Sequence, residues 1–430
     1  MQREVYNKLI DWKLSPYRKP LILEGARQVG KTWLMLELAK SYSNYVYVNF
    51  DKDSWAKDLF IADYDIARIL LTLEAHSNEH IVAGETLIIF DELQEAERGL
   101  GVLKYFYEDA PEHHVIVAGS LLGITLHSGQ SFPVGKVDRI RVYPLTFTEF
   151  LRANGEDIKV ECLQNKQWNV VSSLAPAYIN ILRQYYFVGG MPEAVSAFVA
   201  NRDLKQVRTI QQNILIGYKS DISKHAPASE VKRILMVLQS LPSQLSKENK
   251  KFIYGVLRQG ARAKDFELAI QWLIDAGIIY RVNRVTEPCI PLSMYEELGI
   301  FKLFMLDCGL LACLAGVPAS QILTEDNIFH EWKGAFSEQY VLQQLLSVYD
   351  SVAYWSSNDS ECEIDFLVQT ENTIVPIEVK AEENVKSKSL HHFVTERYPL
   401  LRGVRFSMKD YIEQDWLINI PLYAVCSTEL

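Results

Sequence analysis

A run of eight residues near the N-terminus has the types and spacing of a phosphate-binding loop. It reads Gly25, Ala26, Arg27, Gln28, Val29, Gly30, Lys31 and Thr32. Glycines at both ends allow a tight turn whose backbone N–H groups point at phosphate oxygens. The lysine reaches the β- and γ-phosphates, and the threonine offers its hydroxyl to Mg²⁺. The run therefore predicts an ATP site, with Thr32 as a ligand of Mg²⁺.

Further polar groups follow two later apolar segments. The stretch 86–92 reads TLIIFDE, which is typical of a buried parallel strand that ends at a site. Asp91 is expected to hold Mg²⁺ through water, and Glu92 to polarise the attacking water as general base beside Lys31. Ser120 closes the strand predicted over 113–119, where it either senses the γ-phosphate or caps the next turn.

The elements around these residues have the order of a P-loop fold. Helical periodicity follows the loop over 31–42 and returns over about 99–108, and strands are expected over 21–23, 45–50, 113–119 and 137–142. Strands that alternate with helices indicate an α/β fold with a doubly wound parallel sheet, whose site lies at the carboxyl ends of the strands.

A second set of candidate catalytic residues lies near the C-terminus. A strand is predicted over 363–368 and its return strand over 374–380, with a tight hairpin centred on residues 371 and 372. That hairpin pairs residues whose numbers sum to 743, which places Asp365 opposite Glu378, with their Cβ atoms about 5 Å apart. Lys380 shares the face of Glu378, and Glu338 can approach from an apolar helix. Carboxylates beside a lysine are typical of a Mg²⁺ or Mn²⁺ site that hydrolyses phosphodiesters.

The middle of the chain is predicted to be a winged helix. Residues 249–325 show a helix over 252–257, a turn, a helix over 264–276 and two strands over 278–285 and 301–307. The second helix is acidic rather than basic. Seven basic residues flank it: Lys247, Lys250, Lys251, Arg258, Arg262, Arg281 and Arg284. They could hold a nucleic-acid backbone, and a protein-docking winged helix would look the same.

Several stretches resemble a known family. EGARQVGKT, FDELQ, LKYFYE, VAGSLLG, FPVGKVDRIRVYPLTFTEFL and VGGMPEAV occur in the order seen in a large prokaryotic family of AAA-type P-loop ATPases, which are fused to a C-terminal domain of unknown role. The resemblance implies a catalytic-glutamate ATPase, with Asp91 for Mg²⁺ and Glu92 as base. Many members have arginine where this chain has Lys136, so Lys136, Arg139 and Arg141 all remain candidates for a charge-stabilising finger.

The C-terminal residues resemble a second group. Asp365, Glu378-Val379-Lys380 and the helical Glu338 occupy the motif positions of the PD-(D/E)xK nuclease superfamily. The resemblance implies a nuclease-like α/β domain with a second Mg²⁺ or Mn²⁺. It also implies DNA or RNA as a partner, although such folds also serve as recognition modules without activity.

Composition narrows the class of protein. The net charge of −10 argues against a general nucleic-acid coat, but residues 231–290 carry +5 and residues 331–430 carry −8. No apolar run is long enough to span a bilayer, the N-terminus lacks a signal peptide, and the six cysteines show no zinc spacing. These features favour a cytoplasmic protein with no membrane partner and reduced thiols.

The sequence thus predicts four modules. They are an ATPase core over 1–155, a helical lid over 156–230, a winged helix over 231–325 and a nuclease-like domain over 326–430. Two functions remain open. The chain is either an ATPase that serves a nucleic-acid-directed nuclease site, or a nucleotide-switched regulator whose nuclease-like domain is silent. In the second case that domain binds a protein partner or a second copy of the chain.

Overall fold

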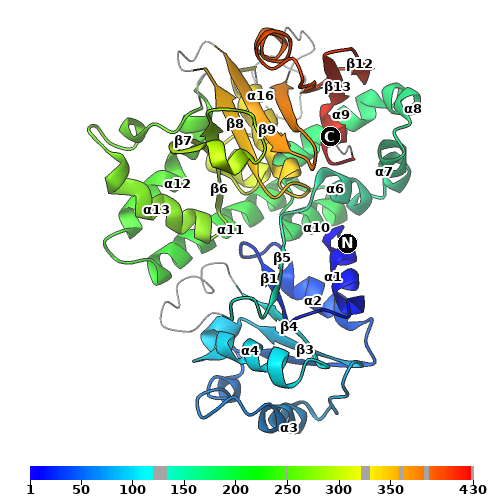
Figure 1. Ribbon diagram of the computed structural model, residues 1–430, viewed down its shortest axis with the longest axis vertical. Helices are drawn as coiled ribbons and strands as arrows, with labels where there is room; N and C mark the ends of the chain where they lie inside the picture. Colours follow the sequence, from blue (N-terminus) through cyan, green and yellow to red (C-terminus); the bar gives the residue numbers. More distant parts are fainter. Residues whose placement is uncertain (120–132, 248–249, 321–329, 358–361, 382–386, 428–430) are drawn as a thin grey trace. The chain divides into compact units, whose positions relative to one another are not determined.

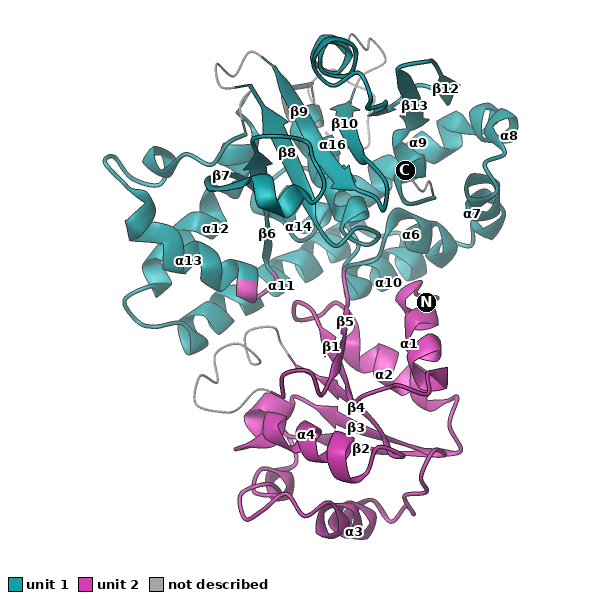
Figure 2. Cartoon of the chain, viewed as in Figure 1, with its two compact units in different colours: residues 1, 144–274, 278–430 teal, residues 2–143, 275–277 magenta. Residues whose placement is uncertain are grey.

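The computed structural model describes residues 1–430 except 120–132, 248–249, 321–329, 358–361, 382–386 and 428–430 (Figure 1). The chain divides into two compact units (Figure 2). We call Gln2–Tyr143 with Asp275–Gly277 the N-terminal unit. Pro144–Ile274 with Ile278–Leu430 and Met1 form the C-terminal unit.

A parallel sheet of five strands forms the centre of the N-terminal unit. In spatial order the strands are β2 (Asn44–Asn49), β3 (Thr86–Asp91), β4 (His114–Ala118), β1 (Leu21–Glu24) and β5 (Asp138–Arg141). Every neighbouring pair is parallel, which confirms the predicted sheet. Because parallel strands end at the same edge, the residues that follow β1 and β3 are brought together there.

Helices bury apolar faces on this sheet. Helices α3 (Ile66–Ser77) and α4 (Gly99–Asp109) join β2, β3 and β4 in one core that includes Phe90 and Phe106, both almost fully buried. Each such side chain contributes roughly 1.5–3 kcal/mol by leaving water. Helix α2 (Lys31–Ala39) contacts β3 and β4 and begins directly at the phosphate-binding loop, and α1 (Val5–Leu14) contacts α2. The core therefore fixes the strand ends that carry the loop and the carboxylates.

The C-terminal unit begins with a run of helices. They are α6 (Phe147–Ala153), α7 (Asp157–Gln164), α8 (Trp168–Ser173), α9 (Ala175–Val188), α10 (Pro192–Asn201) and α11 (Leu204–His225). Helix α6 starts with a capping box, in which Thr146 accepts from the backbone N–H of Glu149 and the Glu149 carboxylate accepts from that of Thr146. The region predicted as a lid is thus helical, while its role as a lid stays a prediction.

A buried aspartate fixes the Gly-Gly turn between α9 and α10. Asp307, which begins α14 (Cys308–Leu314), is fully buried and accepts hydrogen bonds from the backbone N–H groups of Gly190 (2.6 Å) and Leu310 (2.9 Å). Burial raises the pKa of its carboxyl group, and these bonds act in the opposite direction. Gly189 has φ +73° and ψ −166°, a region that only glycine commonly adopts. A Cβ there would lie 2.1 Å from Asp307 Oδ1.

We predict that Gly189→Ala lowers the free energy of unfolding by about 2–4 kcal/mol, because backbone strain and a clash with Asp307 add. Gly217→Ala is the matched control. Gly217 lies inside α11, where a Cβ would meet nothing within 4 Å, so this change should raise stability by about 0.5–1 kcal/mol. Chemical denaturation measures both variants. Equal effects of the two changes would contradict the assigned role of Gly189.

A mixed sheet of eight strands forms the rest of the C-terminal unit. Its spatial order is β12 (Ile412–Glu413), β13 (Leu417–Pro421), β11 (Gly403–Ser407), β10 (Ile374–Lys380), β9 (Glu363–Gln369), β8 (Val352–Ser356), β6 (Ile279–Val285) and β7 (Glu296–Met305). Helix α16 (His330–Leu345) contacts β10, and the short α17 (Lys388–His392) contacts β9 and β10. Strands from the predicted winged helix and from the predicted nuclease-like domain therefore share one sheet.

The winged helix is not confirmed. Helix α13 (Ala263–Asp275) and the hairpin β6–β7 are present, and α12 (Val231–Leu245) precedes them. The predicted helix over 252–257 is wrong, because this segment holds only a 3₁₀ turn, Tyr254–Val256. The backbone of this segment pairs with a strand instead. The N–H of Phe252 donates to Phe301 O of β7 (2.8 Å), and the two rings stack. The two strands predicted for the winged helix instead form the end of the eight-stranded sheet, since β6 also pairs with β8.

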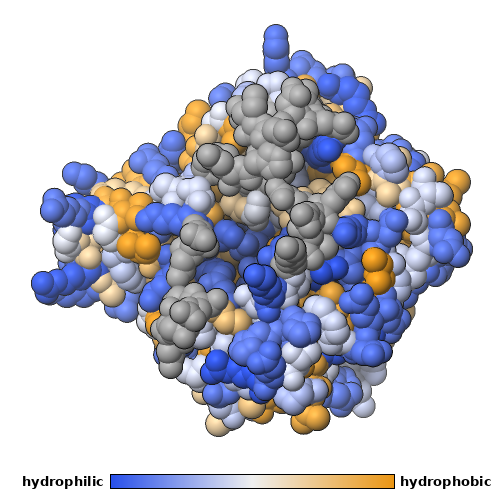
Figure 3. Space-filling model, turned by 90° about the horizontal axis from the view of Figure 1, so that it is seen from above, coloured by the Kyte–Doolittle hydropathy of each residue, from blue (hydrophilic) through white to orange (hydrophobic). Residues whose placement is uncertain are grey.

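The face drawn in Figure 3 mixes hydrophilic residues with scattered hydrophobic ones, which is ordinary for a protein surface. Among the described helices, none has the length and apolar character needed to cross a membrane. The six cysteines form no disulfide.

Candidate functional site

The phosphate-binding loop joins β1 to α2 in the N-terminal unit, which is the context that its sequence predicted. Gly30 has φ +95° and is the N-cap of α2, so the N-terminal end of this helix faces the loop. Gly25 has φ +154°, and a Cβ there would lie 2.4 Å from Val142 O. Only glycine fits at this position, because the loop passes directly against the segment that follows β5.

An arginine that the sequence analysis missed supports the loop from outside. Arg3 is buried, and its guanidinium donates to Val29 O (3.1 Å) and Tyr143 O (2.7 Å). It ties the loop to the segment after β5. No motif marks Arg3, which lies just before α1 and precedes the loop by more than twenty residues.

Lys31 is folded into its own loop. Its ammonium donates to Gly25 O (2.9 Å) and Ala26 O (2.8 Å), and the residue is 9% exposed. Burial lowers the pKa of Lys31 to about 8, although the nearby carboxylates of Glu92 and Asp91 act to raise it. An ammonium held by neutral carbonyls in a desolvated loop would gain strongly from a polyphosphate.

Thr32 and Asp91 meet as the sequence predicted. The Thr32 hydroxyl donates to Asp91 Oδ2 (3.0 Å), and Tyr47 on β2 donates to the same oxygen (2.8 Å). Asp91 is 3% exposed. Burial raises the pKa of Tyr47 to about 12, so this hydroxyl remains a donor at neutral pH. A hydroxyl and a carboxylate oxygen in contact are a donor set that suits Mg²⁺. Tyr47 was not predicted as part of the site, and its only signal in the sequence is its place two residues before the end of β2.

Glu92 follows β3 at the same edge. Its φ of +54° is left-handed, which is uncommon for a non-glycine residue and frequent at functional sites. Its backbone N–H donates to Ala118 O at the end of β4 (2.9 Å), and Gln94 donates a side-chain hydrogen bond to Glu92 Oε2. The backbone of Glu92 is thus held against the end of β4, and Gln94 holds its carboxylate. Gln94 was not predicted as part of the site.

The other residues predicted for the nucleotide site are Ser120 and the three candidates for a charge-stabilising finger. Ser120 lies outside the described residues. Two of the three finger candidates form ion pairs within the N-terminal unit, Lys136 with Glu108 (3.1 Å) and Arg139 with Glu24 (3.1 Å). The guanidinium of Arg141 lies over the Tyr143 ring. The finger therefore stays unassigned.

The register of the C-terminal hairpin is confirmed. Four pairs of β9 and β10, from Gln369 with Ile374 to Phe366 with Ile377, have numbers that sum to 743. These pairs end at Phe366 with Ile377, one position before the predicted pair of Asp365 with Glu378. Asp365 Oδ2 accepts from the backbone N–H of Val379 (2.8 Å), which fixes its side chain against β10.

Cations surround these carboxylates. Lys380 pairs with Glu378 (2.8 Å), as the sequence predicted, and Lys250 forms an ion pair with Glu338 Oε1. Lys302 of β7 is fully buried and pairs with Glu363 (2.5 Å). Arg405 of β11 is the register partner of Glu378 on the other side of β10. Lys302 and Arg405 could not be predicted as parts of this site, because the pairing of β7 and β11 with their neighbours was not predicted. Glu363 lies on the predicted hairpin, but its partner Lys302 does not.

We call these eight side chains the carboxylate–lysine cluster. They are Glu338, Asp365, Glu363 and Glu378 with Lys250, Lys302, Lys380 and Arg405. Burial raises the pKa of Asp365 to about 7, the charge of Glu338 acts in the same direction, and Lys302 and Lys250 oppose them. The members are thus close enough to influence one another's ionisation.

Two carboxylate oxygens of the cluster have no hydrogen-bond donor among the described residues. They are Glu338 Oε2 and Glu378 Oε2, and each residue is 4% exposed. A buried carboxylate oxygen without a donor is costly, and a hard cation is one group that satisfies it. Within the described part of the chain, however, no three His, Cys, Asp or Glu side chains are arranged to hold a metal ion. The donor chemistry fits a divalent cation, while the side chains as placed are paired with lysines instead.

Several basic residues that were expected to face nucleic acid are engaged within the C-terminal unit. Lys250 pairs with Glu338, and Arg284 lies 3.1 Å from Glu297. Arg281 donates to Leu298 O and lies over the Phe301 ring. These three side chains make contacts within the C-terminal unit, and their expected role in holding phosphates stays a prediction.

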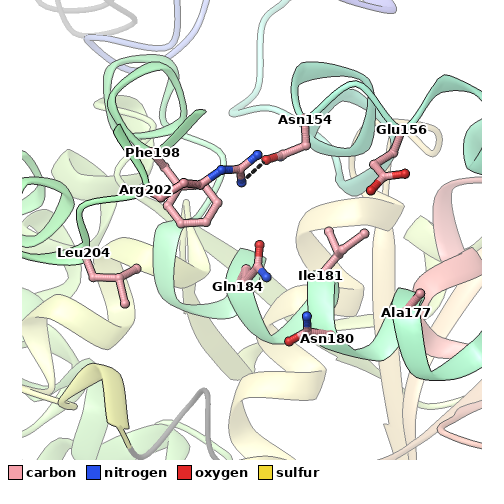
Figure 4. A pocket seen from close by; sticks show the side chains of 9 residues that line it. All are labelled: Asn154, Glu156, Ala177, Asn180, Ile181, Gln184, Phe198, Arg202 and Leu204. Atoms are coloured by element: carbon pink, nitrogen blue, oxygen red, sulfur yellow. Dashed lines mark hydrogen bonds between the residues drawn. The ribbon is translucent and has the colours of Figure 1, made fainter. Parts of the chain in front are cut away.

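A pocket of about 520 Å³ lies between α6, α9 and α10 in the C-terminal unit (Figure 4). Arg202 lies over the Phe198 ring at one wall and donates to Asn154, while Gln184 and Asn180 project from α9. None of the predicted site residues lines this pocket.

Comparisons with known proteins agree with the prediction of a nucleotide site in the N-terminal unit. Residues 17–151 match the family model described as AAA domain. Residues 179–321 and 333–423 match two domains of unknown function, DUF8612 and DUF4143. Among curated proteins, no sequence matches the chain.

Three solved structures match much of the chain at low sequence identity. They are the Walker-type ATPase PABY2304 of Pyrococcus abyssi (14% identity, 73% of this chain, 95% of that chain, TM-score 0.45), the Aeropyrum pernix ORC1 protein in complex with DNA (12%, 75%, 95%, 0.27) and AMPPCP-bound DnaA from Aquifex aeolicus (15%, 63%, 86%, 0.28).

The AAA-domain match covers every described residue of the nucleotide site, from Gly25 to Glu92. It supports ATP binding and hydrolysis by this part of the chain. Residues 17–151 are therefore an AAA-type P-loop ATPase domain.

Proposed function

We propose that the chain couples ATP hydrolysis at the P-loop to a metal-dependent, nuclease-like site in the carboxylate–lysine cluster, with DNA or RNA as substrate. The observation that carries the proposal is the pair of buried carboxylate oxygens of Glu338 and Glu378 that lack a donor among the described residues, beside Asp365 and Lys380. The proposed division into core, lid, winged helix and nuclease-like domain keeps the boundaries given above, and the cytoplasm is the expected location.

In the proposed ATPase site, the backbone of residues 25–30 cradles the phosphates and Lys31 turns from its own carbonyls to the β- and γ-phosphates. Thr32 and Asp91 would hold Mg²⁺, which would neutralise phosphate charge. Glu92 accepts a proton from the attacking water. Ser120 is proposed to sense the γ-phosphate.

The lowered pKa of Lys31 predicts that ATP binding takes up protons at alkaline pH. Without nucleotide its pKa is about 8, and the charges of the bound phosphates should raise it. Below about pH 7, Lys31 is protonated in both states and no proton moves. At pH 8.5, where it is mostly neutral before binding, ATP binding should take up a large fraction of one proton. Calorimetry in two buffers with different ionisation enthalpies measures this number, and no uptake at pH 8.5 would contradict the described state of Lys31.

In the proposed nuclease-like site, Glu338, Asp365 and Glu378 would hold Mg²⁺ or Mn²⁺, which would supply an activated water, and Lys380 would stabilise negative charge on the phosphodiester. We predict that the purified chain cuts a branched, linear or single-stranded nucleic acid with Mn²⁺ and ATP. Asp365→Asn should reduce cutting by on the order of 10²-fold or more, because it removes a charged ligand.

Asp350→Asn is the control, since Asp350 is an exposed carboxylate just before β8. The control should cut like the natural chain. If no substrate is cut, or if both variants cut alike, the nuclease proposal is wrong.

A second candidate is a nucleotide-switched regulator with a silent nuclease-like domain. It is favoured by the charge balance of the cluster, in which four carboxylates already face four basic side chains. This candidate predicts tight nucleotide binding, slow hydrolysis, and an oligomeric state or protein partner that changes with the nucleotide. Hydrolysis that is stimulated by nucleic acid would count against it.

A further inference from the structure

We propose that Lys250 is a built-in competitor for the divalent cation of the carboxylate–lysine cluster, so that its ammonium must leave Glu338 before a metal ion binds there. The inference rests on the proposed nuclease-like function and concerns the regulation of that site. Lys250 lies in the connection between α12 and the turn at Tyr254–Val256, outside the strands and helix that carry the predicted motif.

The ammonium of Lys250 acts where a metal ion would. It forms an ion pair with Glu338 Oε1, and its charge opposes the rise in the pKa of Asp365 that burial causes. Both carboxylates are proposed metal ligands. A cation close to both of them opposes the approach of a second cation by direct repulsion and also uses one of the carboxylate oxygens.

The charge balance of the cluster supports competition. With Lys250 in place, three lysines form ion pairs with three of the four carboxylates, and Arg405 is the register partner of Glu378. Counted together, these charges balance, so a divalent ion would leave an excess of two positive charges. Without the charge of Lys250, the excess would be one. Partly buried charges are stable only when they are balanced, so the cluster should bind a divalent ion more tightly once Lys250 is withdrawn.

Lys250 is a better candidate for this exchange than Lys302. Lys302 is fully buried on β7, pairs with Glu363 and lies over the Tyr354 ring, so moving its side chain would disrupt the sheet. Lys250 extends from a connection, and its side chain is 14% exposed. It can leave Glu338 by rotating its own flexible stem.

The backbone next to Lys250 is anchored independently of its side chain. The amide of Gln244 accepts from the N–H of Ile253 (3.1 Å) and donates to its carbonyl (3.0 Å). Phe252 N–H donates to Phe301 O (2.8 Å). A substitution that keeps the length of Lys250 should therefore leave the fold intact.

The first test measures Mn²⁺ binding to the full chain without nucleotide. Lys250→Met should bind Mn²⁺ about tenfold more tightly than the natural chain, since one nearby like charge is removed. Lys264→Met, at an exposed position of α13, should bind like the natural chain. Each protein is compared with the same protein carrying Glu378→Gln, so that only Mn²⁺ held by the cluster is counted.

The second test separates competition from a purely structural ion pair. In EDTA, Lys250→Met should lower the melting temperature, because Glu338 loses its partner. Saturating Mn²⁺ should restore it and should stabilise this variant more than the natural chain. An equal loss of melting temperature with and without Mn²⁺, together with unchanged Mn²⁺ affinity, would overturn the proposal. If no protein shows Mn²⁺ binding that depends on Glu378, then the metal site fails, and the proposed nuclease function with it.

Discussion

Glu92→Gln should leave ATP binding intact and reduce ATP hydrolysis by on the order of 10²–10⁴-fold, which is the usual contribution of a general base. Glutamine keeps the size and the hydrogen-bonding reach of Glu92 but cannot accept the proton of the attacking water. The left-handed backbone and the bond from Glu92 N–H to Ala118 O involve the main chain only, so the variant should keep the same local fold.

Glu95→Gln is the matched control for this prediction. Glu95 lies three residues later in the same short 3₁₀ turn and is exposed, so its replacement should change turnover little. Steady-state phosphate release and equilibrium binding of a fluorescent ATP analogue give the two quantities. If Glu92→Gln hydrolyses ATP at the natural rate, another residue acts as base.

Lys31→Ala should abolish measurable ATP hydrolysis and weaken ATP binding strongly. Removal of the ammonium deletes the positive charge that would face the β- and γ-phosphates inside a desolvated loop, where charge-assisted bonds are strongest. The same change should not lower the stability of the nucleotide-free protein greatly. Burial already lowers the pKa of Lys31 to about 8, so the folded state gains little from its charge when no phosphate is bound.

Lys40→Ala, one residue beyond α2 and exposed, is the control for charge removal near the same helix. It should bind and hydrolyse ATP like the natural chain. Thermal melting with and without ATP adds an independent readout, since ATP should raise the melting temperature of the control but not that of Lys31→Ala. Stabilisation of Lys31→Ala by ATP to the natural extent would refute the role given to Lys31.

The nucleotide site could be predicted from the sequence because its signals are local. Gly25 to Thr32 are consecutive, and Asp91 and Glu92 end one apolar strand. In a parallel sheet all strands end at one edge, so consecutive strand-to-helix connections are enough to bring these residues together. Three other residues of the site were not predicted, because each joins it through packing rather than through a motif. They are Arg3, Tyr47 and Gln94.

The C-terminal hairpin was predictable for a similar reason. A tight turn fixes the register of two strands, and so the pairing of β9 with β10 followed from counting along the chain. The predicted helix over 252–257 failed because six residues with a helical pattern cannot hold a helix without support, and β7 offered the backbone of Phe252 a partner.

By itself, the sequence determined the P-loop, the strand that carries Asp91 and Glu92, and the carboxylates of one hairpin, since all of these depend on neighbours along the chain. Only the tertiary structure decided which cations face those carboxylates. Lys250 and Lys302 come from segments that precede Glu338 by 88 and 36 residues, and their positions depend on how β6 and β7 join the sheet of β8–β13. Such pairing is set by long-range strand contacts that leave no periodic signal in the sequence.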